Sequence, residues 1–308
     1  MARHLRLAAF LLATVALTAC NGSLTVNLTD TPADDAASVV IDFTGIELHN
    51  TNGQTVTINF PSAQRMDLMQ LQNGVTAALL QAHSVPSGTY DWVQLNVLAD
   101  KDTQGESYIM LNTGALYPLY IPSGSATGLK VTTSFSVPQN GSTQVLIEFD
   151  LRQSITGAVP DGQSYDLAPA LRVEDQSQVG TIAANVDLGA LSSRQLGSGA
   201  QVSQCRAGLF VFSGGSVTPQ NGGGASLVDI QPIPYFGSNE SSVSMPNLAK
   251  GSYTLAATCN YDLYAPTAVP GQSGYQTLHW TVQENVSVTA NTTTTVNLPS
   301  GSTSNTVK

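Results

Sequence analysis

Residues 144–152 read QVLIEFDLR, and this stretch decides the fold class. Apolar and polar residues alternate along it, which places one face of a β-strand on a core and the other in water. The apolar set is Val145, Ile147, Phe149 and Leu151. The same two-residue period recurs at residues 24–28. Residues 144–152 therefore predict a strand of a half-buried antiparallel sheet.

Turn signals interrupt the strand-like stretches at short intervals, as at Asn52-Gly53 and Asn140-Gly141. Many short strands with regular turns are typical of β-sandwiches. Helical periodicity is weak, and the best candidate is residues 75–82 (VTAALLQA), expected to form one or two turns. The chain is therefore predicted to be all-β.

Composition excludes several classes of protein. Charged residues make up 10% of the 308 residues, and the formal net charge is −10. Nucleic-acid binding starts from a basic surface, so no nucleic-acid partner is expected. The low content of charged residues also excludes a coiled coil. A hydrophobic content of 42% is sufficient for a core.

Residues 1–19 have the organisation of a secretory signal, with Arg3 and Arg6 before an apolar run at residues 7–17. The run is too short to span a bilayer and ends in Leu-Thr-Ala-Cys20. This ending resembles the lipobox of bacterial lipoproteins, which implies cleavage before Cys20 and a lipid on its sulfur. The alternative is a plain signal peptide with an incidental cysteine. An aspartate directly after the lipidated cysteine would resemble an inner-membrane retention signal of Gram-negative bacteria. Position 21 is Asn21 instead, which favours the outer membrane, on either its periplasmic or its outer face.

Lipidation of Cys20 would leave two cysteines, Cys205 and Cys259. An even number in an exported chain favours one disulfide. The bridge would stabilise the fold by roughly 3–4 kcal/mol in the chain-entropy model. Two buried free thiols are the alternative.

The charge pattern divides the chain near residues 176–179. Residues 20–176 carry 16 acidic and 5 basic side chains, whereas residues 177–308 carry 5 and 4. We therefore expect a signal peptide at 1–19 and two β-sandwich domains in series, at 20–176 and 177–308.

Three segments of the first half have counterparts, in the same order, in the second. Residues 22–28 (GSLTVNL) match 180–186 (GTIAANV), and 85–90 (VPSGTY) match 248–253 (LAKGSY). Residues 135–140 (FSVPQN) match 286–291 (VSVTAN). The shared order predicts two sandwiches of related topology, although β-turn sequences also repeat by chance.

Residues 22–175 resemble the bacterial domain of unknown function 4382. The matching stretches are SLTVNLTDTPADD, VVIDFTGIELH, MDLMQLQNG, VPSGTYDWVQLNV and YDLAPALRV. This family is typical of exported bacterial lipoproteins, and no activity is assigned to it. Residues 180–300 are similar to transthyretin-like (prealbumin-like) or carboxypeptidase-regulatory-like β-sandwiches, through CRAGLFVF, NLAKGSYTLAAT and NVSVTANTTTTVNL. Such modules usually act as spacers, stalks or binding domains.

The search for catalytic motifs finds no nucleophile elbow, phosphate-binding loop or paired-histidine metal site. Glu148 and Asp150 share a strand face, followed by Arg152. A carboxylate pair is the catalytic arrangement of glycosidases. The alternation favours instead a water-facing strand surface, with Arg152 as an ion-pair partner.

Two further groups of residues are candidates for binding. Asp30, Asp34 and Asp35 follow the first strand-like segment and could supply oxygen ligands to calcium. The alternative is turn capping by Asp30, with the other two carboxylates solvated. Trp92 and Trp280 could stack on sugars, but their places inside strand patterns favour core packing.

The sequence thus predicts a lipid-anchored, exported protein of the cell envelope that acts as a non-enzymatic structural or interaction module. Its partners would be the membrane, through the lipid, and a protein or glycan. A calcium-assisted carbohydrate-binding surface lipoprotein is the alternative, and an unrecognised hydrolase is a third possibility. No cofactor is expected for the structural or interaction module, and calcium belongs only to the carbohydrate-binding alternative.

Overall fold

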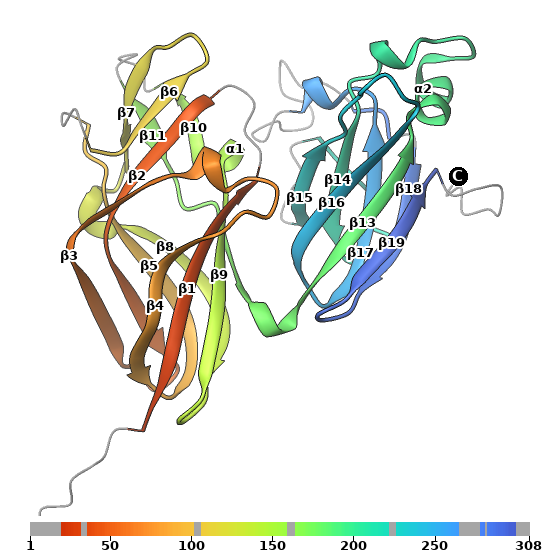
Figure 1. Ribbon diagram of the computed structural model, residues 1–308. Helices are drawn as coiled ribbons and strands as arrows, with labels where there is room; N and C mark the ends of the chain where they lie inside the picture. The colour runs from red at the N-terminus through yellow and green to blue at the C-terminus, as the bar shows by residue number, and fades with distance from the viewer. Residues whose placement is uncertain are drawn as a thin grey trace, which may run out of the picture.

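The computed structural model describes residues 20–31, 36–101, 106–158, 164–221, 226–264, 278–280 and 282–299. Within these ranges the chain forms two β-sandwiches that lie side by side (Figure 1). The predicted all-β class is confirmed. No helix of the described ranges is long and apolar enough to cross a membrane.

In the described residues, twelve strands and four short helical segments build the first sandwich. The strands are β1 (Asn21–Thr31), β2 (Ala36–Asn50), β3 (Thr55–Asp67), β4 (Ala77–Pro86), β5 (Gly88–Leu98), β6 (Tyr108–Leu111), β7 (Leu116–Tyr120), β8 (Leu129–Val137), β9 (Ser142–Asp150), β10 (Ile155–Ala158), β11 (Tyr165–Leu167) and β12 (Leu171–Asp175). The helical segments are η1 (Leu68–Leu71), η2 (Ser125–Thr127), α1 (Leu151–Ser154) and η3 (Gln176–Gln178).

The second sandwich begins directly after η3. Its described strands are β13 (Val179–Asp187), β14 (Gly208–Ser213), β15 (Leu227–Pro232), β16 (Glu240–Ala249), β17 (Gly251–Thr258), β18 (Val282–Val288) and β19 (Thr293–Leu298). Its helical segments include α2 (Leu188–Leu196), η4 (Val202–Gln204) and η6 (Tyr261–Leu263).

The two sandwiches share a seven-stranded plan. In the first, one sheet contains β9-β1-β4, with β1 and β9 parallel, and the other contains β3, β2, β5 and β8 as successive neighbours. In the second, the sheets are β19-β13-β16, with β13 and β19 parallel, and β15-β14-β17-β18. The first sandwich adds β12 to the edge of β9, and β6, β7, β10 and β11 to the other sheet. The predicted relation between the two halves is confirmed.

A close backbone approach repeats at the start of both sandwiches. A Cβ on Gly22 would lie 2.3 Å from the carbonyl oxygen of Pro138, and one on Gly180 would lie 2.3 Å from that of Thr289. No side chain fits at that distance, so the glycine present at both positions lets β1 pass the turn before β9, and β13 the turn before β19.

Each sandwich has its own hydrophobic core. The first includes Phe43, Tyr90 and Phe149, and the second includes Leu209 and Leu255. The predicted disulfide joins Cys205, just before β14, to Cys259, just after β17, with the Cα atoms 4.5 Å apart. The disulfide therefore links the paired strands β14 and β17 of the second sandwich.

Two expected elements are different and one was not expected. The strand predicted at 144–152 ends at Asp150, because residues 151–154 form α1, and its sheet is mixed, since β9 pairs parallel with β1 and antiparallel with β12. Residues 77–86 form strand β4, so the helix predicted at 75–82 is wrong. Helix α2 begins where the Asp187 carboxylate accepts a hydrogen bond from the backbone NH of Ala190, at 2.8 Å. An aspartate at this position is a strong helix-start residue.

Candidate functional site

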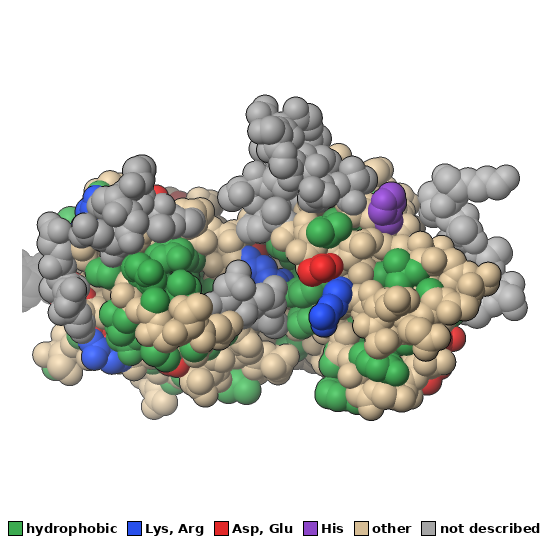
Figure 2. Space-filling view, turned by 90° about the horizontal axis from the view of Figure 1, so that it is seen from above, with side chains coloured by type: hydrophobic (Ala, Val, Ile, Leu, Met, Phe, Trp, Pro, Cys, Tyr) green, Lys and Arg blue, Asp and Glu red, His purple; other side chains and the backbone are tan. Residues whose placement is uncertain are grey.

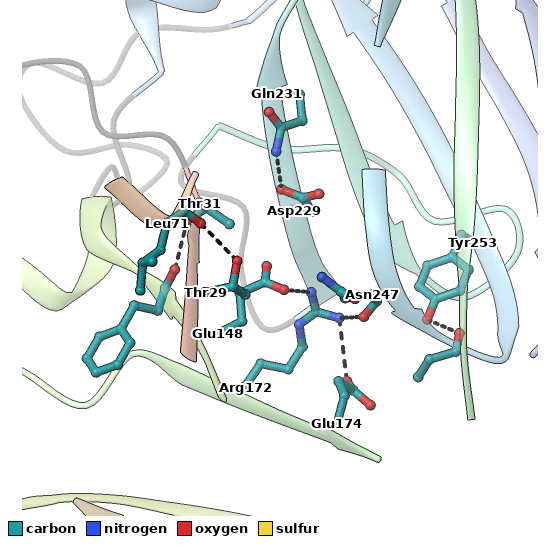
Figure 3. Close-up of polar contacts among 12 residues, drawn as sticks. Thr29, Thr31, Leu71, Glu148, Arg172, Glu174, Asp229, Gln231, Asn247 and Tyr253 are labelled. Atoms are coloured by element: carbon teal, nitrogen blue, oxygen red, sulfur yellow. Dashed lines mark hydrogen bonds and ion pairs between the residues drawn. The ribbon is translucent and has the colours of Figure 1, made fainter. Parts of the chain in front are cut away.

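Charged side chains from both sandwiches meet between β12 of the first and β15 and β16 of the second (Figure 3). Arg172 projects from β12, between Glu148 of β9 and the segment of β16 that contains Asn247. Because Arg172 and Glu148 are directly opposite one another in the antiparallel β9–β12 pair, their side chains lie on the same face. The register of this pair creates the ion pair.

Arg172 makes polar contacts to both sandwiches. Its Nη2 lies 2.7 Å from Oε2 of Glu148, and its Nη1 lies 3.5 Å from Oε1 of Glu174. Nη1 also donates a hydrogen bond to the carbonyl oxygen of Asn247, at 3.1 Å. The exposed fraction of the side chain is 20% for Arg172 and 8% for Glu148. This guanidinium therefore ties the two sandwiches together away from bulk water.

Asp229 completes the cluster from β15. Its side chain is buried and accepts a hydrogen bond from Nε2 of Gln231, at 3.3 Å. Burial, together with the nearby charge of Glu148, raises the pKa of Asp229 to about 7, although Arg172 opposes the shift. Burial also raises the pKa of Glu174. For Arg172, burial lowers the pKa, but Glu148 and Glu174 more than reverse this effect.

An open cleft of about 510 Å³ adjoins this cluster. Its walls include Glu148, Asp150, Arg172 and Glu174 from the first sandwich, and Leu227 from the second. Among the described residues, no three His, Cys, Asp or Glu side chains are arranged to hold a metal ion. The cluster can hold the sandwiches in register and exchange a proton near neutral pH.

The surface at the end of the molecule near α2 is poor in charge. Figure 2 shows this end from above, where polar uncharged and hydrophobic atoms dominate and charged side chains are scattered. The buried cluster at the interface thus concentrates charge in a chain that has little of it.

Glu148 and Asp150 do not form the water-facing pair that the sequence predicts. Glu148 is buried because the second sandwich covers its face, and its ion-pair partner is Arg172 rather than Arg152. Asp150 caps α1 by accepting a hydrogen bond from the backbone NH of Gln153, at 3.2 Å. The guanidinium of Arg152 lies over the ring of Tyr261, 4.9 Å from its centroid.

The three aspartates proposed for calcium are described only in part. Asp30 is buried at the end of β1, with an exposed fraction of 4%. Burial raises its pKa well above the usual value, Gln72 opposes the shift, and Asp150 and Glu148 add to it. Asp34 and Asp35 lie outside the described residues. Calcium binding by this group stays a prediction.

The two tryptophans have different environments. Trp280 packs on Phe210 and Phe212, with ring centroids 4.9 and 6.0 Å apart, as expected for a residue beside a core. Trp92 instead lies on the outer face of β5 and is only partly buried, so its predicted core position is wrong.

Two neighbours contact the ring of Trp92. The His49 ring stacks on it at 5.1 Å, and Nζ of Lys130 lies 3.6 Å from its centroid. His49 lies on β2 and Lys130 on β8, the two strands that pair with β5 on either side of Trp92, so both neighbours reach the ring across the sheet. Stacking on a sugar would compete with these contacts.

His49 also contacts an acid, which sequence reasoning did not single out. Its Nδ1 lies 2.7 Å from Oδ1 of Asp91. Among the hydrogen bonds of the described side chains, none joins this imidazole to a serine or cysteine. The pair therefore lacks the nucleophile of a hydrolytic triad.

The match to a family model lies within the first sandwich. Residues 21–169 match the family model described as Domain of unknown function (DUF4382). This finding confirms the predicted resemblance of the N-terminal half. No curated protein matches the chain.

Solved structures show only distant similarity. A leucine-rich repeat protein from Bacteroides thetaiotaomicron is 13% identical, with 91% of this chain and 26% of that chain covered and a TM-score of 0.24. The Bacillus anthracis TIE protein is 11% identical, with 90% and 34% covered and a TM-score of 0.19. GBS52, the minor pilin of Streptococcus agalactiae, is 11% identical, with 90% and 94% covered and a TM-score of 0.19. This chain thus spans about a quarter and a third of the first two proteins.

Proposed function

We propose that this protein is anchored by a lipid on Cys20 and serves the cell envelope as a non-enzymatic structural or interaction module. The observation that carries the proposal is the place of Cys20. It is exposed and directly precedes β1, and its carbonyl oxygen accepts a hydrogen bond from the backbone NH of Ser87, at 2.8 Å.

This position has a mechanical consequence. Because the sandwich begins at the next residue, a lipid on Cys20 would hold this end of the first sandwich against the membrane without a linker. The turn that precedes β5 and contains Ser87 would then face the lipid headgroups. The lipid and the charge-poor sandwiches together favour a fixed spacer or docking platform over a diffusing enzyme.

The described side chains support a non-enzymatic role. The polar cluster at the interface binds the two sandwiches to each other, and its Arg172 is already engaged by three acceptors. His49 is held by Asp91 and Trp92. These arrangements stabilise structure and present no activated nucleophile.

Metabolic labelling with a palmitate analogue, followed by membrane fractionation, tests the anchor. The wild-type protein should take up the label and sediment with membranes, whereas Cys20→Ala should do neither. The matched control is Cys205→Ala/Cys259→Ala, which lacks the disulfide but should still be labelled. Unlabelled wild-type protein, or Cys20→Ala that still sediments with membranes, would overturn the proposal.

We further propose the outer membrane as the site of anchoring, on the basis of Asn21. Protease treatment of intact cells, followed by detection of a tag at residue 308, distinguishes its two faces. Loss of the tag while a periplasmic marker stays intact indicates the cell surface. Protection until the envelope is permeabilised indicates the periplasmic face.

A further inference from the structure

The two sandwiches differ at one edge. In the first, the outer edge of β9 is paired with β12, in antiparallel register from Phe149–Leu171 to Val145–Asp175. The equivalent strand of the second sandwich is β19, which pairs with β13 on one side. No strand in the described part of the chain pairs with its other side, and β19 lies at the outer margin of the molecule (Figure 1).

The open edge of β19 is regular and has no charge. Its residues Thr293 to Leu298 read TTTVNL, and its pairing with β13 runs without a register shift. Threonine and valine are strong strand formers. A strand of this composition offers unpaired NH and carbonyl groups to any extended chain that reaches it.

The other edges of the second sandwich carry features that discourage pairing. Strand β16 contains Pro246 and then Asn247, whose φ of 60° is left-handed. Strand β15 ends at Pro232, and its register with β14 shifts near Val211. Strand β18 carries the charge of Glu284. Proline, irregular register and charge are the usual protections of an edge strand, and among the described edge strands of this sandwich only β19 lacks all three.

Strand β12 shows how the side chains of a strand added to such an edge are oriented. Leu171 and Val173 pack against the first core, whereas Arg172 and Glu174 face the other way. On β19, Val296 and Leu298 face the second core, and Thr295 is exposed. A strand beside β19 would therefore extend the core with apolar side chains at every second position.

We propose that the outer edge of β19 accepts an extended, antiparallel segment of another protein, with alternating apolar and polar side chains. This inference deepens the proposed interaction role and rests on it. Pairing along the backbone would supply affinity, and the apolar positions would supply selectivity. The second sandwich would thereby acquire the strand that β12 provides to the first.

The test uses the full chain with Cys20→Ala, so that its outcome does not depend on a lipid. The probe is a fluorescent peptide that copies residues 169–177 (PALRVEDQS), which contain β12. We expect saturable binding and slower hydrogen exchange of the β19 backbone amides. The amides of β16 are the internal control and should not change.

Two altered peptides separate strand pairing from other binding. N-methylation of alternate backbone nitrogens on the pairing side should weaken binding at least tenfold, because it removes the donors. A scrambled peptide without the alternation should bind equally weakly. Absence of saturable binding, protection that appears on β16 instead of β19, or self-association of the chain through β19 would overturn the inference. A negative result here would leave labelling at Cys20 intact, so failure of the docking edge and failure of the anchor are distinguishable.

Discussion

Tyr90 and Tyr253 occupy the same place in the two sandwiches and make the same hydrogen bond. The hydroxyl of Tyr90 donates to the carbonyl oxygen of Pro86, and that of Tyr253 donates to the carbonyl oxygen of Ala249, both at 2.6 Å. Each acceptor lies four residues before its tyrosine, at the end of the preceding strand. The hydroxyl thus closes the corner where the chain passes from one sheet to the other.

Removal of either hydroxyl should destabilise the sandwich that contains it. We expect Tyr90→Phe and Tyr253→Phe each to lower the free energy of unfolding by about 1–2 kcal/mol, because a partly buried carbonyl loses its donor. Urea unfolding measures the change in the free energy of unfolding, and hydrogen exchange measured separately for the amides of each sandwich shows which sandwich is affected. Each variant is the matched control for the other, and a Tyr253→Phe effect confined to the first sandwich would contradict the interpretation.

The disulfide should stabilise the second sandwich specifically. The bridge encloses a sequence separation of 54 residues, so the variant Cys205→Ala/Cys259→Ala should lose roughly 3–4 kcal/mol. Urea unfolding of the wild type with and without reductant should reproduce this difference. The double variant should not respond to reductant; equal stability of variant and wild type would contradict the expectation.

Replacement of Arg172 should leave two carboxylates without their cation. We expect Arg172→Leu to cost about 3–5 kcal/mol, because Glu148 is largely buried beside it. Adding Glu148→Gln should restore part of that loss, since it removes one of the stranded charges. A double-mutant cycle in urea measures the coupling, and strictly additive effects would show that the two side chains do not act as a pair.

Asp229 should make stability fall as the pH rises. Its pKa in the folded protein is about 7, against a usual value of 3.8. Between these two values the folded state holds a proton that the unfolded chain releases, so the free energy of unfolding declines across this window. Below about pH 3.8 Asp229 is protonated in both states, so it does not change the free energy of unfolding. Above pH 7 it is ionised in both states, and its full destabilising effect is present.

The variant Asp229→Asn isolates this effect. Asparagine can still accept a hydrogen bond from Gln231 but cannot ionise, so the variant should be more stable than wild type at pH 8, by an amount on the order of 2–4 kcal/mol. At pH 4 the two should be nearly equal. Unfolding curves at several pH values test this, and parallel pH profiles for variant and wild type would refute the assignment to Asp229.

Local sequence patterns were sufficient to predict most strands and the related topology of the two sandwiches. Alternation at residues 24–28 and 144–152 predicts β1 and β9 because each strand has one face on a core. The pattern misleads at β4, where neighbours Leu79 and Leu80 are both buried and Ala82 has a φ of 43°. The pairing of β1 with β4 also shifts register there. This irregularity breaks the two-residue period and leaves an apolar run that resembles a helix.

The polar cluster could not be predicted for a different reason. Alternation correctly turns Glu148 away from the first core, but the sequence does not show that a second sandwich covers that face. Asp229 becomes buried through the same packing. Both depend on contacts between distant segments, such as Arg172 with the carbonyl of Asn247, 75 residues later. Periodicity within one strand carries no information on such contacts.

Parallel pairing of β1 with β9, and of β13 with β19, sets a condition on folding during the proposed export. The hydroxyl of Thr31 in β1 donates to the carbonyl oxygen of Phe149 in β9, 118 residues later, and Asn185 in β13 bonds to Asn297 in β19, 112 residues later. A chain that leaves a translocation channel from its N-terminus therefore presents β1 long before β9 is available. Closing loops of this length is slow. The edge of β1 that pairs with β9, and the edge of β13 that pairs with β19, must therefore stay open until nearly all of the sandwich has crossed the membrane, whereas the opposite edges can pair earlier with β4 and β16.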